Sequence, residues 1–222
     1  MHKQKIIENE SVSYASNVCA VILAGGKSSR MGGTNKALLK IMGKSIIERQ
    51  IEILDEIFSE TMIITNSPDC YKFLGKPIFM DIIPGKASLG GLFTGLMSAN
   101  KPHCFFVACD MPFLNQQIIN LMLTNVDEHD IVIPKISGKF EPLHAIYSRK
   151  CIPFIEKLIS SDKLQIFGFF DQVDVCEIKG SELRKIDPFL SFTINVNTPE
   201  DLEKATRKLI LERRNDGLRR KK

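Results

Sequence analysis

The sequence lacks any apolar run long enough to cross a membrane. Its longest run, residues 18–24 (VCAVILA), falls far short of the roughly 20 residues that a membrane-spanning helix needs. A secretory signal peptide is not indicated either, because Glu8 and Glu10 interrupt the segment before this run and glycines follow it. We therefore expect a cytoplasmic protein with no membrane partner.

The six cysteines lack the spacing of a zinc site or a redox motif. None belongs to a C-x-x-C pair, and most lie within apolar runs, where a free thiol behaves as a small hydrophobic side chain. His103, Cys104 and Cys109 lie on and beside one predicted strand, without the spacing of zinc ligands. We therefore interpret the cysteines as buried thiols of a reducing compartment.

The body of the chain has no excess of charge of either sign. The formal net charge of +4 comes from residues 213–222 (RRNDGLRRKK), which carry six basic side chains and one acidic one, while the rest of the chain holds 24 basic and 25 acidic groups. A nucleic-acid-binding domain would carry a basic patch, so we expect no nucleic-acid partner. The length and pattern predict a loose leader over 1–17, a single domain over 18–212 and a frayed basic tail over 213–222.

Strands alternate with helices along the predicted domain. Short apolar or β-branched runs predict strands at residues 18–23, 61–65, 78–80, 103–108, 130–134, 143–148, 173–178 and 191–196. Periodic apolar residues predict helices at 43–58, 92–100, 115–126, 149–159, 162–170 and 200–214, with Ser45 and Thr198 as N-caps.

This order predicts an α/β fold: a three-layer sandwich around a mostly parallel, mixed and twisted sheet with a Rossmann-like nucleotide-binding half. In such sheets the ligand binds beyond the carboxyl ends of the strands. We therefore look for chemistry in the loops that follow the first four predicted strands. The segment 81–91 (DIIPGKASLGG), which follows the third, is predicted as a loop.

The loop after the first strand, LAGGKSSRMGGTNK at residues 23–36, is glycine-rich and basic. Gly26-Lys27-Ser28 resembles the end of an ATPase phosphate loop, but that motif needs a glycine where Val21 lies in the middle of a strand. Glycines at both ends of a longer loop allow backbone N–H groups to approach an anion, and Arg30 and Lys36 supply cations for phosphates. A polyphosphate-wrapping loop is therefore favoured over a basic surface loop.

Two carboxylates follow predicted strands at the same edge of the sheet. Asp110 comes after the apolar run HCFFVA, and Asp81 comes after residues 78–80. A carboxylate in this place suits Mg²⁺ bound jointly by protein and phosphates, whereas the alternative is that Asp110 only caps the turn before Pro112. The presence of both carboxylates favours a metal–nucleotide site.

Polar residues near the end of the domain are further candidates. Asn195 alternates with apolar neighbours, so its side chain is expected to face the cleft, while Asn197 has the alternative of bonding to its own turn. For His144 we favour a hydrogen-bonded, partly buried histidine over a catalytic one, because nucleotidyl transfer in a metal site does not require histidine.

With these residues assembled, the chain resembles the molybdenum cofactor guanylyltransferases, the MobA family of nucleotidyltransferases of the sugar-nucleotide pyrophosphorylase type. LAGGKSSRMGGTNKALL is similar to the signature loop of this family, and TNSPD, MDIIPG, SLGGLFTGL, ACDMPFL, PLHAIY and NVNTPEDL follow in the family's order. The resemblance therefore runs from about residue 18 to about residue 209.

The resemblance assigns roles to individual residues. It implies that Arg30, Lys36 and Asp110 are catalytic and that Asp110 binds Mg²⁺. It implies a nucleotide-binding set of Leu23, Ala24, Gly25, Gly26, Lys36, Asn66, Asp81 and Asp110. Asn195 and Asn197 are predicted to contact the acceptor.

The reaction implied by the resemblance transfers GMP from GTP to the terminal phosphate of molybdopterin, giving molybdopterin guanine dinucleotide and pyrophosphate. GTP and molybdopterin are therefore the expected partners, and contacts with molybdoenzymes or other proteins of cofactor biosynthesis are further candidates. Ala24-Gly25-Gly26 resembles the guanylyltransferases rather than their cytidylyltransferase relatives, which tend to have Ala-Ala-Gly at this place.

One departure from the family pattern keeps alternatives open. Where the family usually has G-P-L-x-G, this sequence has Ala87-Ser88-Leu89-Gly90-Gly91, without the proline. The alternatives are a related nucleotidyltransferase that uses CTP or a sugar-phosphate acceptor, and a nucleotide-binding partner subunit without catalysis. The presence of Arg30, Lys36 and Asp110 speaks against the second alternative.

Overall fold

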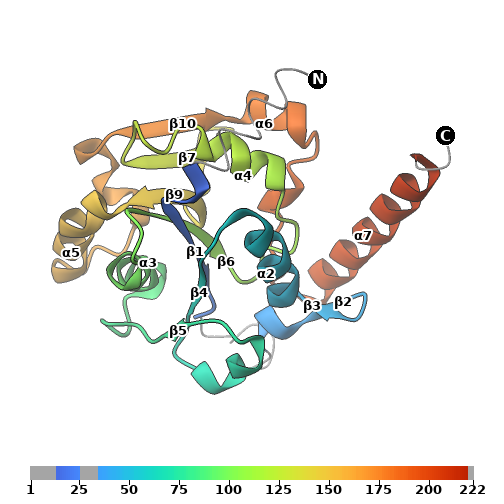
Figure 1. Ribbon diagram of the computed structural model, residues 1–222, viewed down its shortest axis with the longest axis horizontal. Coiled ribbons are helices and arrows are strands. Elements are labelled where there is room, and N and C mark those ends of the chain that lie inside the picture. The colour runs from blue at the N-terminus through green and yellow to red at the C-terminus, as the bar shows by residue number, and fades with distance from the viewer. Residues whose placement is uncertain (1–13, 26–34, 220–222) are drawn as a thin grey trace.

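The computed structural model describes residues 14–25 and 35–219, and Figure 1 shows a central sheet with helices on both sides. The sheet has eight strands in the order β10-β7-β9-β6-β1-β4-β5, and β8 pairs with β7 beside this path. Its strands are β1 (Val18–Leu23), β4 (Thr61–Ile64), β5 (Ile78–Phe79), β6 (His103–Ala108), β7 (Ile131–Ile136), β8 (Lys139–Phe140), β9 (His144–Ser148) and β10 (Val175–Lys179).

The sheet is mixed. The pairs β1–β4, β1–β6, β4–β5 and β7–β10 are parallel, and β9 runs antiparallel to both β6 and β7. Every residue of β1 is buried, as predicted for a strand covered on both faces. Its side chains alternate between two clusters of the core, because successive side chains of a strand point to opposite faces. The predicted α/β sandwich is confirmed.

Helices form the two outer layers. The first cluster is covered by α2 (Ile46–Ile57), α4 (Gln116–Leu123) and α6 (Gly180–Ile186). The second is covered by α3 (Ala87–Ser98), α5 (Ile152–Ser160) and the 3₁₀ helix η6 (Ile166–Gln172). The predicted capping box of α2 is present: the Glu48 N–H donates to Ser45 Oγ at 3.4 Å, and the Ser45 N–H donates to Glu48 Oε2 at 2.8 Å.

A small third cluster joins the last helix to the body. Helix α7 (Pro199–Arg219) packs through Leu202, Ala205 and Leu209 against a hairpin of β2 (Lys40–Ile41) and β3 (Lys44–Ser45), and its far end extends away from the body (Figure 1). The predicted N-cap is confirmed, because Thr198 Oγ1 accepts from the Asp201 N–H at 3.1 Å. Among the described residues, no helix combines the length and the apolar character needed to cross a membrane.

The hairpin β2–β3 was not predicted, because the sequence indicated a loop up to about Gly43. Met42 and Gly43 have φ angles of 51° and 82° and form a two-residue turn with both centres in the left-handed region. This is the geometry of the turns that suit tight hairpins. Met42 carries no sequence sign of such a conformation, so propensity alone did not reveal it.

The predicted last strand at residues 191–196 is wrong. Ser191–Thr193 form a 3₁₀ helix, η7, after Leu190 in a left-handed conformation with φ 49°. The cause is Asp187, whose carboxylate accepts hydrogen bonds from the backbone N–H of Phe189 and of Ser191 and so turns the chain. Residues 194–197 are therefore not part of the sheet.

The predicted loop at residues 81–91 is shorter than expected. Helix α3 already begins at Ala87, so the glycines at 90 and 91 lie in its first turns. A Cβ atom on Gly90 would lie 3.1 Å from the Ile83 carbonyl oxygen, and one on Gly91 would lie 3.1 Å from Leu23 Cδ2. These glycines therefore allow close packing of the helix start against the loop and against β1.

Shorter segments complete the chain. The remaining 3₁₀ helices are η2 (Lys36–Leu38), η3 (Pro68–Cys70), η4 (Lys72–Leu74) and η5 (Arg149–Cys151). All six cysteines are free, and Cys19, Cys104 and Cys151 are buried, whereas Cys70 is exposed. The predicted helix at 162–170 is shifted and takes the 3₁₀ form in η6.

Candidate active site

The predicted site lies at the carboxyl edge of the sheet, where β5, β4, β1 and β6 end side by side. Leu23 of β1 pairs with Ile64 of β4 and with Ala108 of β6, and Ile64 pairs with Phe79 of β5. The residues that follow these strands therefore share one edge, where ligands of such sheets bind. The predicted site residues brought to this edge are Leu23, Ala24, Gly25, Asn66, Asp81 and Asp110.

The end of β1 is held by both neighbouring strands. The Ala24 N–H donates to the Ile64 carbonyl at 2.8 Å, and Thr65 Oγ1 donates to the Ala24 carbonyl at 3.0 Å. On the other side the Cys109 N–H donates to the Leu23 carbonyl at 3.1 Å. The glycine-rich loop therefore starts from a fixed backbone.

The far end of this loop is fixed as well. Gly26 and Arg30 lie outside the described residues, and the described chain resumes at Asn35. The Tyr71 hydroxyl is buried and donates to Asn35 Oδ1 at 3.0 Å. This contact holds the residue that precedes Lys36. Sequence reasoning missed Tyr71, because a single tyrosine in a polar segment has no informative pattern.

Three predicted residues from distant parts of the chain meet at the end of β6. Lys36 Nζ donates to Asn197 Oδ1 at 2.6 Å and lies 3.9 Å from Asp110 Oδ2. The side chains of Lys36 and Asp110 are 22% and 21% exposed, so both are mostly shielded and still reachable. The Val196 N–H donates to the Asp110 carbonyl at 2.8 Å, which fixes the 194–197 segment beside the site.

The electrostatics of Asp110 are governed by burial. Loss of water raises the pKa of this carboxyl, and the nearby Lys36 ammonium opposes the rise. A charged carboxylate that is partly withdrawn from water is stabilised by a cationic partner, so this position is suited to a bound cation. Burial raises the pKa of the adjacent Cys109 thiol to about 12, which disfavours the nucleophilic thiolate form.

Asn66 and Asp81 form a separate pair farther along the edge. Asn66 Nδ2 donates to Asp81 Oδ2 at 2.7 Å, and the Asp81 N–H donates to Asn66 Oδ1 at 3.2 Å. The buried Thr94 of α3 accepts from the Ile82 N–H at 2.9 Å through its hydroxyl oxygen, which ties the Asp81 loop to the helix. The pair presents exposed polar groups at the end of β5.

The remaining candidates, Asn195, Asn197 and His144, lie in different surroundings. Asn197 joins Lys36, whereas Asn195 is exposed on the same segment. The expectation of a partly buried, hydrogen-bonded His144 is wrong: its ring is fully buried between Phe105 and Phe192, and neither ring nitrogen has a hydrogen-bond partner among the described residues. The cause is the position of His144 on β9, where it pairs with Val107 of the inner strand β6 and its ring contacts the rings of Phe105 and Phe192.

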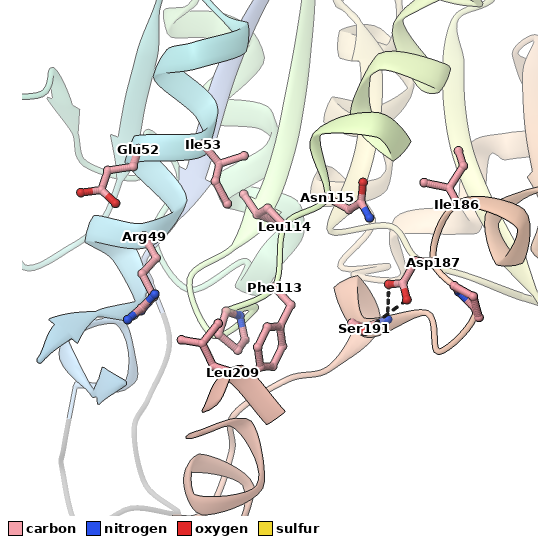
Figure 2. Close-up of a pocket in the computed structure, with 12 residues that line it drawn as sticks. Arg49, Glu52, Ile53, Phe113, Leu114, Asn115, Ile186, Asp187, Ser191 and Leu209 are labelled. Atoms are coloured by element: carbon pink, nitrogen blue, oxygen red, sulfur yellow. Dashed lines mark hydrogen bonds between the residues drawn. The ribbon is translucent and has the colours of Figure 1, made fainter. Parts of the chain in front are cut away.

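A cavity of about 400 Å³ lies next to this site but does not contain it. Figure 2 shows Arg49 and Ile53 of α2, Phe113 and Leu114 of the loop after β6, and Leu209 of α7 around it. None of the predicted site residues lines the cavity. The candidate site is therefore the open edge of the sheet.

The mixed sheet, with a glycine-rich sequence after its first strand and a lysine and a carboxylate at its carboxyl edge, is typical of a nucleotide-binding α/β protein. The family described as "MobA-like NTP transferase domain" matches residues 20–171. The chain belongs to this family of nucleotidyltransferases, and the family predicted from the motifs is confirmed.

Curated relatives match over most of their length. The chain is 38% identical over 201 residues to a probable molybdenum cofactor guanylyltransferase of Natranaerobius thermophilus, covering 87% of this chain and 97% of the relative. It is 36% identical over 189 residues to a molybdenum cofactor guanylyltransferase of Desulfosudis oleivorans, covering 85% and 94%.

Solved structures share the fold. The molybdopterin-guanine dinucleotide biosynthesis protein A of Archaeoglobus fulgidus superposes with a TM-score of 0.74 at 25% identity, covering 86% of this chain and 97% of that protein. A CMP:2-keto-3-deoxy-manno-octonic acid synthetase in complex with CTP superposes with a TM-score of 0.67 at 15% identity, covering 89% and 100%. At this identity the second likeness concerns the fold alone.

Proposed function

We propose that this protein transfers GMP from GTP to the terminal phosphate of molybdopterin, giving molybdopterin guanine dinucleotide and pyrophosphate. The observation that carries the proposal is the meeting of Lys36, Asp110 and Asn197 at the carboxyl edge of the sheet. The names of the curated relatives, which match this chain over at least 85% of its length, support the choice of reaction.

The nucleotide is proposed to bind along the ends of β1, β4 and β5. Backbone groups of the segment that begins with Leu23, Ala24 and Gly25 and continues into Gly26 would receive the nucleoside and phosphates, because glycines allow close approach. The Asn66–Asp81 pair offers amide and carboxylate groups within reach of the base or ribose.

The residues present fit a divalent metal bound jointly with phosphates, for which we propose Mg²⁺. Asp110 is a partly desolvated carboxylate, and the Lys36 ammonium lies 3.9 Å from its Oδ2 atom. Among the described residues, no group of three or more His, Cys, Asp or Glu side chains is placed to hold a metal without a ligand's help. Mg²⁺ is typically held by one or two carboxylates together with substrate phosphates, and it screens charge on the phosphates when bound.

The proposed reaction requires charge screening more than proton transfer. A phosphate oxygen of molybdopterin attacks the α-phosphorus of GTP, and the bond from this phosphorus to the oxygen bridging to the β-phosphate breaks, so pyrophosphate leaves with the electron pair. The nucleophile is already ionised, so no general base is required. Lys36, and Arg30 from the same loop, would stabilise the charge that develops on the leaving pyrophosphate.

The acceptor is proposed to approach from the 194–197 segment. Asn197 touches Lys36, and Asn195 is exposed two residues before it, so both amides can donate to an anionic acceptor near the transferred phosphorus. The proposal places the enzyme in the cytoplasm, which supplies nucleoside triphosphates. Molybdoenzymes or other proteins of cofactor biosynthesis would receive the product.

The test of the donor is a calorimetric titration of the purified protein with GTP, CTP and ATP in the presence of Mg²⁺. We expect GTP to bind at least 10-fold more tightly than CTP and ATP, since a site that hydrogen-bonds one base leaves polar groups unpaired with another. Equal or tighter binding of CTP would favour the related cytidylyltransferase reaction instead.

A further inference from the structure

The turn that carries Asp110 is held by a buried amide from another layer of the molecule. Residues 108–111 form a tight turn closed by the Met111 N–H, which donates to the Ala108 carbonyl at 3.2 Å. Gln50 of α2 donates through Nε2 to the Ala108 carbonyl at 2.8 Å and to the Met111 carbonyl at 2.9 Å. One side chain therefore binds both ends of the turn, and Asp110 lies between them.

Gln50 is fully buried, and this contact defines the orientation of its amide. The carbonyl oxygens of Ala108 and Met111 both face the same atom of the Gln50 amide. This atom must be the nitrogen, which has two hydrogens to donate, because an amide oxygen there would be repelled by both carbonyls. Lysine or arginine would also donate twice, but each would bury a charge in this apolar layer. An uncharged amide is the side chain that suits the position.

A contribution to the stability of the fold does not by itself explain why a glutamine is buried at position 50. Its Oε1 atom is buried and has no hydrogen-bond partner within residues 14–25 and 35–219. The penalty for burying an unpaired acceptor is similar in size to the net gain from hydrogen bonds such as those of Nε2. What the side chain does provide is a fixed geometry for the turn beside the reacting groups.

A second contact holds the same turn from the opposite direction. The Val196 N–H donates to the Asp110 carbonyl at 2.8 Å, so the turn is bound both by α2 and by the 194–197 segment. Figure 2 shows α2 lying against the loop that continues from this turn, with Ile53 opposite Leu114. The Asp110 side chain is thus fixed through its backbone.

We propose that Gln50 is a positioning residue for the transfer reaction: it clamps the turn at residues 108–111 so that the Asp110 carboxylate holds its place toward the metal and phosphates. The inference rests on the proposed function for its role in the reaction, but the clamp itself is a property of the chain. It predicts that removal of the two donors loosens the turn and weakens metal binding.

The test uses Gln50→Met in the full chain, because methionine keeps the length and volume of the side chain but has no donor. Backbone amide exchange is measured by NMR or mass spectrometry on the ligand-free protein. We expect the Met111 amide to exchange at least 10-fold faster in the variant. Binding of Mn²⁺ in the presence of GTP, followed by electron paramagnetic resonance, is expected to weaken about 10-fold, as for other residues that orient a metal ligand.

Thr61→Val is the matched control. Thr61 is also a buried polar residue with one side-chain hydrogen bond, to Asp55 Oδ1 at 2.9 Å, but it begins β4 at the opposite edge of the sheet. We expect this variant to lose stability without a change in Mn²⁺ affinity or in exchange of Met111. If Gln50→Met is insoluble, Gln50→Leu, which also lacks a donor and buries no charge, is expected to show the same two changes.

Wild-type exchange at Met111 together with wild-type Mn²⁺ affinity in the Gln50 variant would overturn the proposal. So would equal effects of the Gln50 and Thr61 variants, because these would reflect general loss of stability. The exchange measurement needs neither substrate nor turnover. It therefore tests the clamp even if the protein fails to form the guanine dinucleotide, an outcome that would refute the proposed function alone.

Discussion

At the scale of single residues, Lys36 and Asp110 are far apart in the sequence, but Lys36 Nζ lies 3.9 Å from Asp110 Oδ2. Lys36 also contacts Asn197, so one ammonium lies between the proposed nucleotide edge and the proposed acceptor segment. This position suits a group that screens two anions from each other. Lys27, which resembles the lysine of a phosphate loop, lies outside the described residues and has no proposed role.

Substitution of either charged residue is predicted to abolish transfer. Lys36→Ala and Asp110→Asn each remove a charge from the site, and we expect the rate of GMP transfer to fall about 100-fold or more, in line with the loss of other transition-state contacts. Circular dichroism should show an unchanged fold, since both side chains are at the edge of the sheet. Wild-type turnover in either variant would contradict the mechanism.

His144 makes the fold sensitive to acid. Burial lowers the pKa of this histidine from 6.5 to about 3, so the folded state stays unprotonated while the unfolded state takes up a proton. Between pH 6.5 and about 3 the stability should therefore fall with decreasing pH, by about 1.4 kcal/mol per pH unit from this group.

The measurement is urea unfolding of wild type and His144→Phe between pH 7 and pH 4. The variant should lose less stability over this range, and at pH 7 it should be as stable as wild type or more so, because it buries no unpaired nitrogen. His129→Gln serves as a control, since His129 is only partly buried and pairs with Asp174. Parallel pH curves for wild type and His144→Phe would contradict this explanation.

At the scale of elements, the start of α3 shows how a departure from the family pattern is accommodated. Ala87 stands where the family usually has glycine, and its φ angle is 49°, in the left-handed region that favours glycine. The Asp81 loop ends at this residue, and Thr94 of the same helix binds the loop. Strain at Ala87 is therefore located at the edge of the nucleotide site.

Ala87→Gly is predicted to stabilise the protein slightly, by about 0.5 kcal/mol. Relief of the left-handed conformation contributes about 1 kcal/mol, and the greater freedom of glycine in the unfolded chain offsets about half of it. Ser88→Gly, one residue further into α3, is the control and should destabilise the protein by about 0.5 kcal/mol. Urea unfolding at pH 7 measures both, and equal destabilisation by the two substitutions would show that Ala87 is not strained.

Helices and strands with a clear periodicity of apolar residues could be predicted from the sequence, and elements that depend on tertiary contacts could not. The strand at 103–108 and the capped start of α2 follow from apolar pattern and capping chemistry, and they have the predicted bounds. The strand predicted at 191–196 failed, because the Asp187 carboxylate and the turn at Leu190 outweigh the alternating pattern. No local sequence pattern predicts such a contact between a side chain and the backbone.

At the scale of the whole molecule, the topology brings the site together from separate segments. The ends of four neighbouring strands share one edge, and the 194–197 segment returns to the same edge from the far end of the domain. The carboxylates and lysine of the site could be predicted from their places after strands. Gln50 and Tyr71 could not, because their roles depend on contacts with backbone and side chains far away in the sequence.

The central claim is GMP transfer to molybdopterin, and the formation of the dinucleotide tests it most directly. Purified protein is incubated with Mg²⁺, molybdopterin and either GTP or CTP, and the product is separated by chromatography while pyrophosphate is measured. We predict molybdopterin guanine dinucleotide and an equal amount of pyrophosphate with GTP, and neither without molybdopterin. Release of pyrophosphate with CTP but not with GTP, or no product with either nucleotide, would contradict the claim.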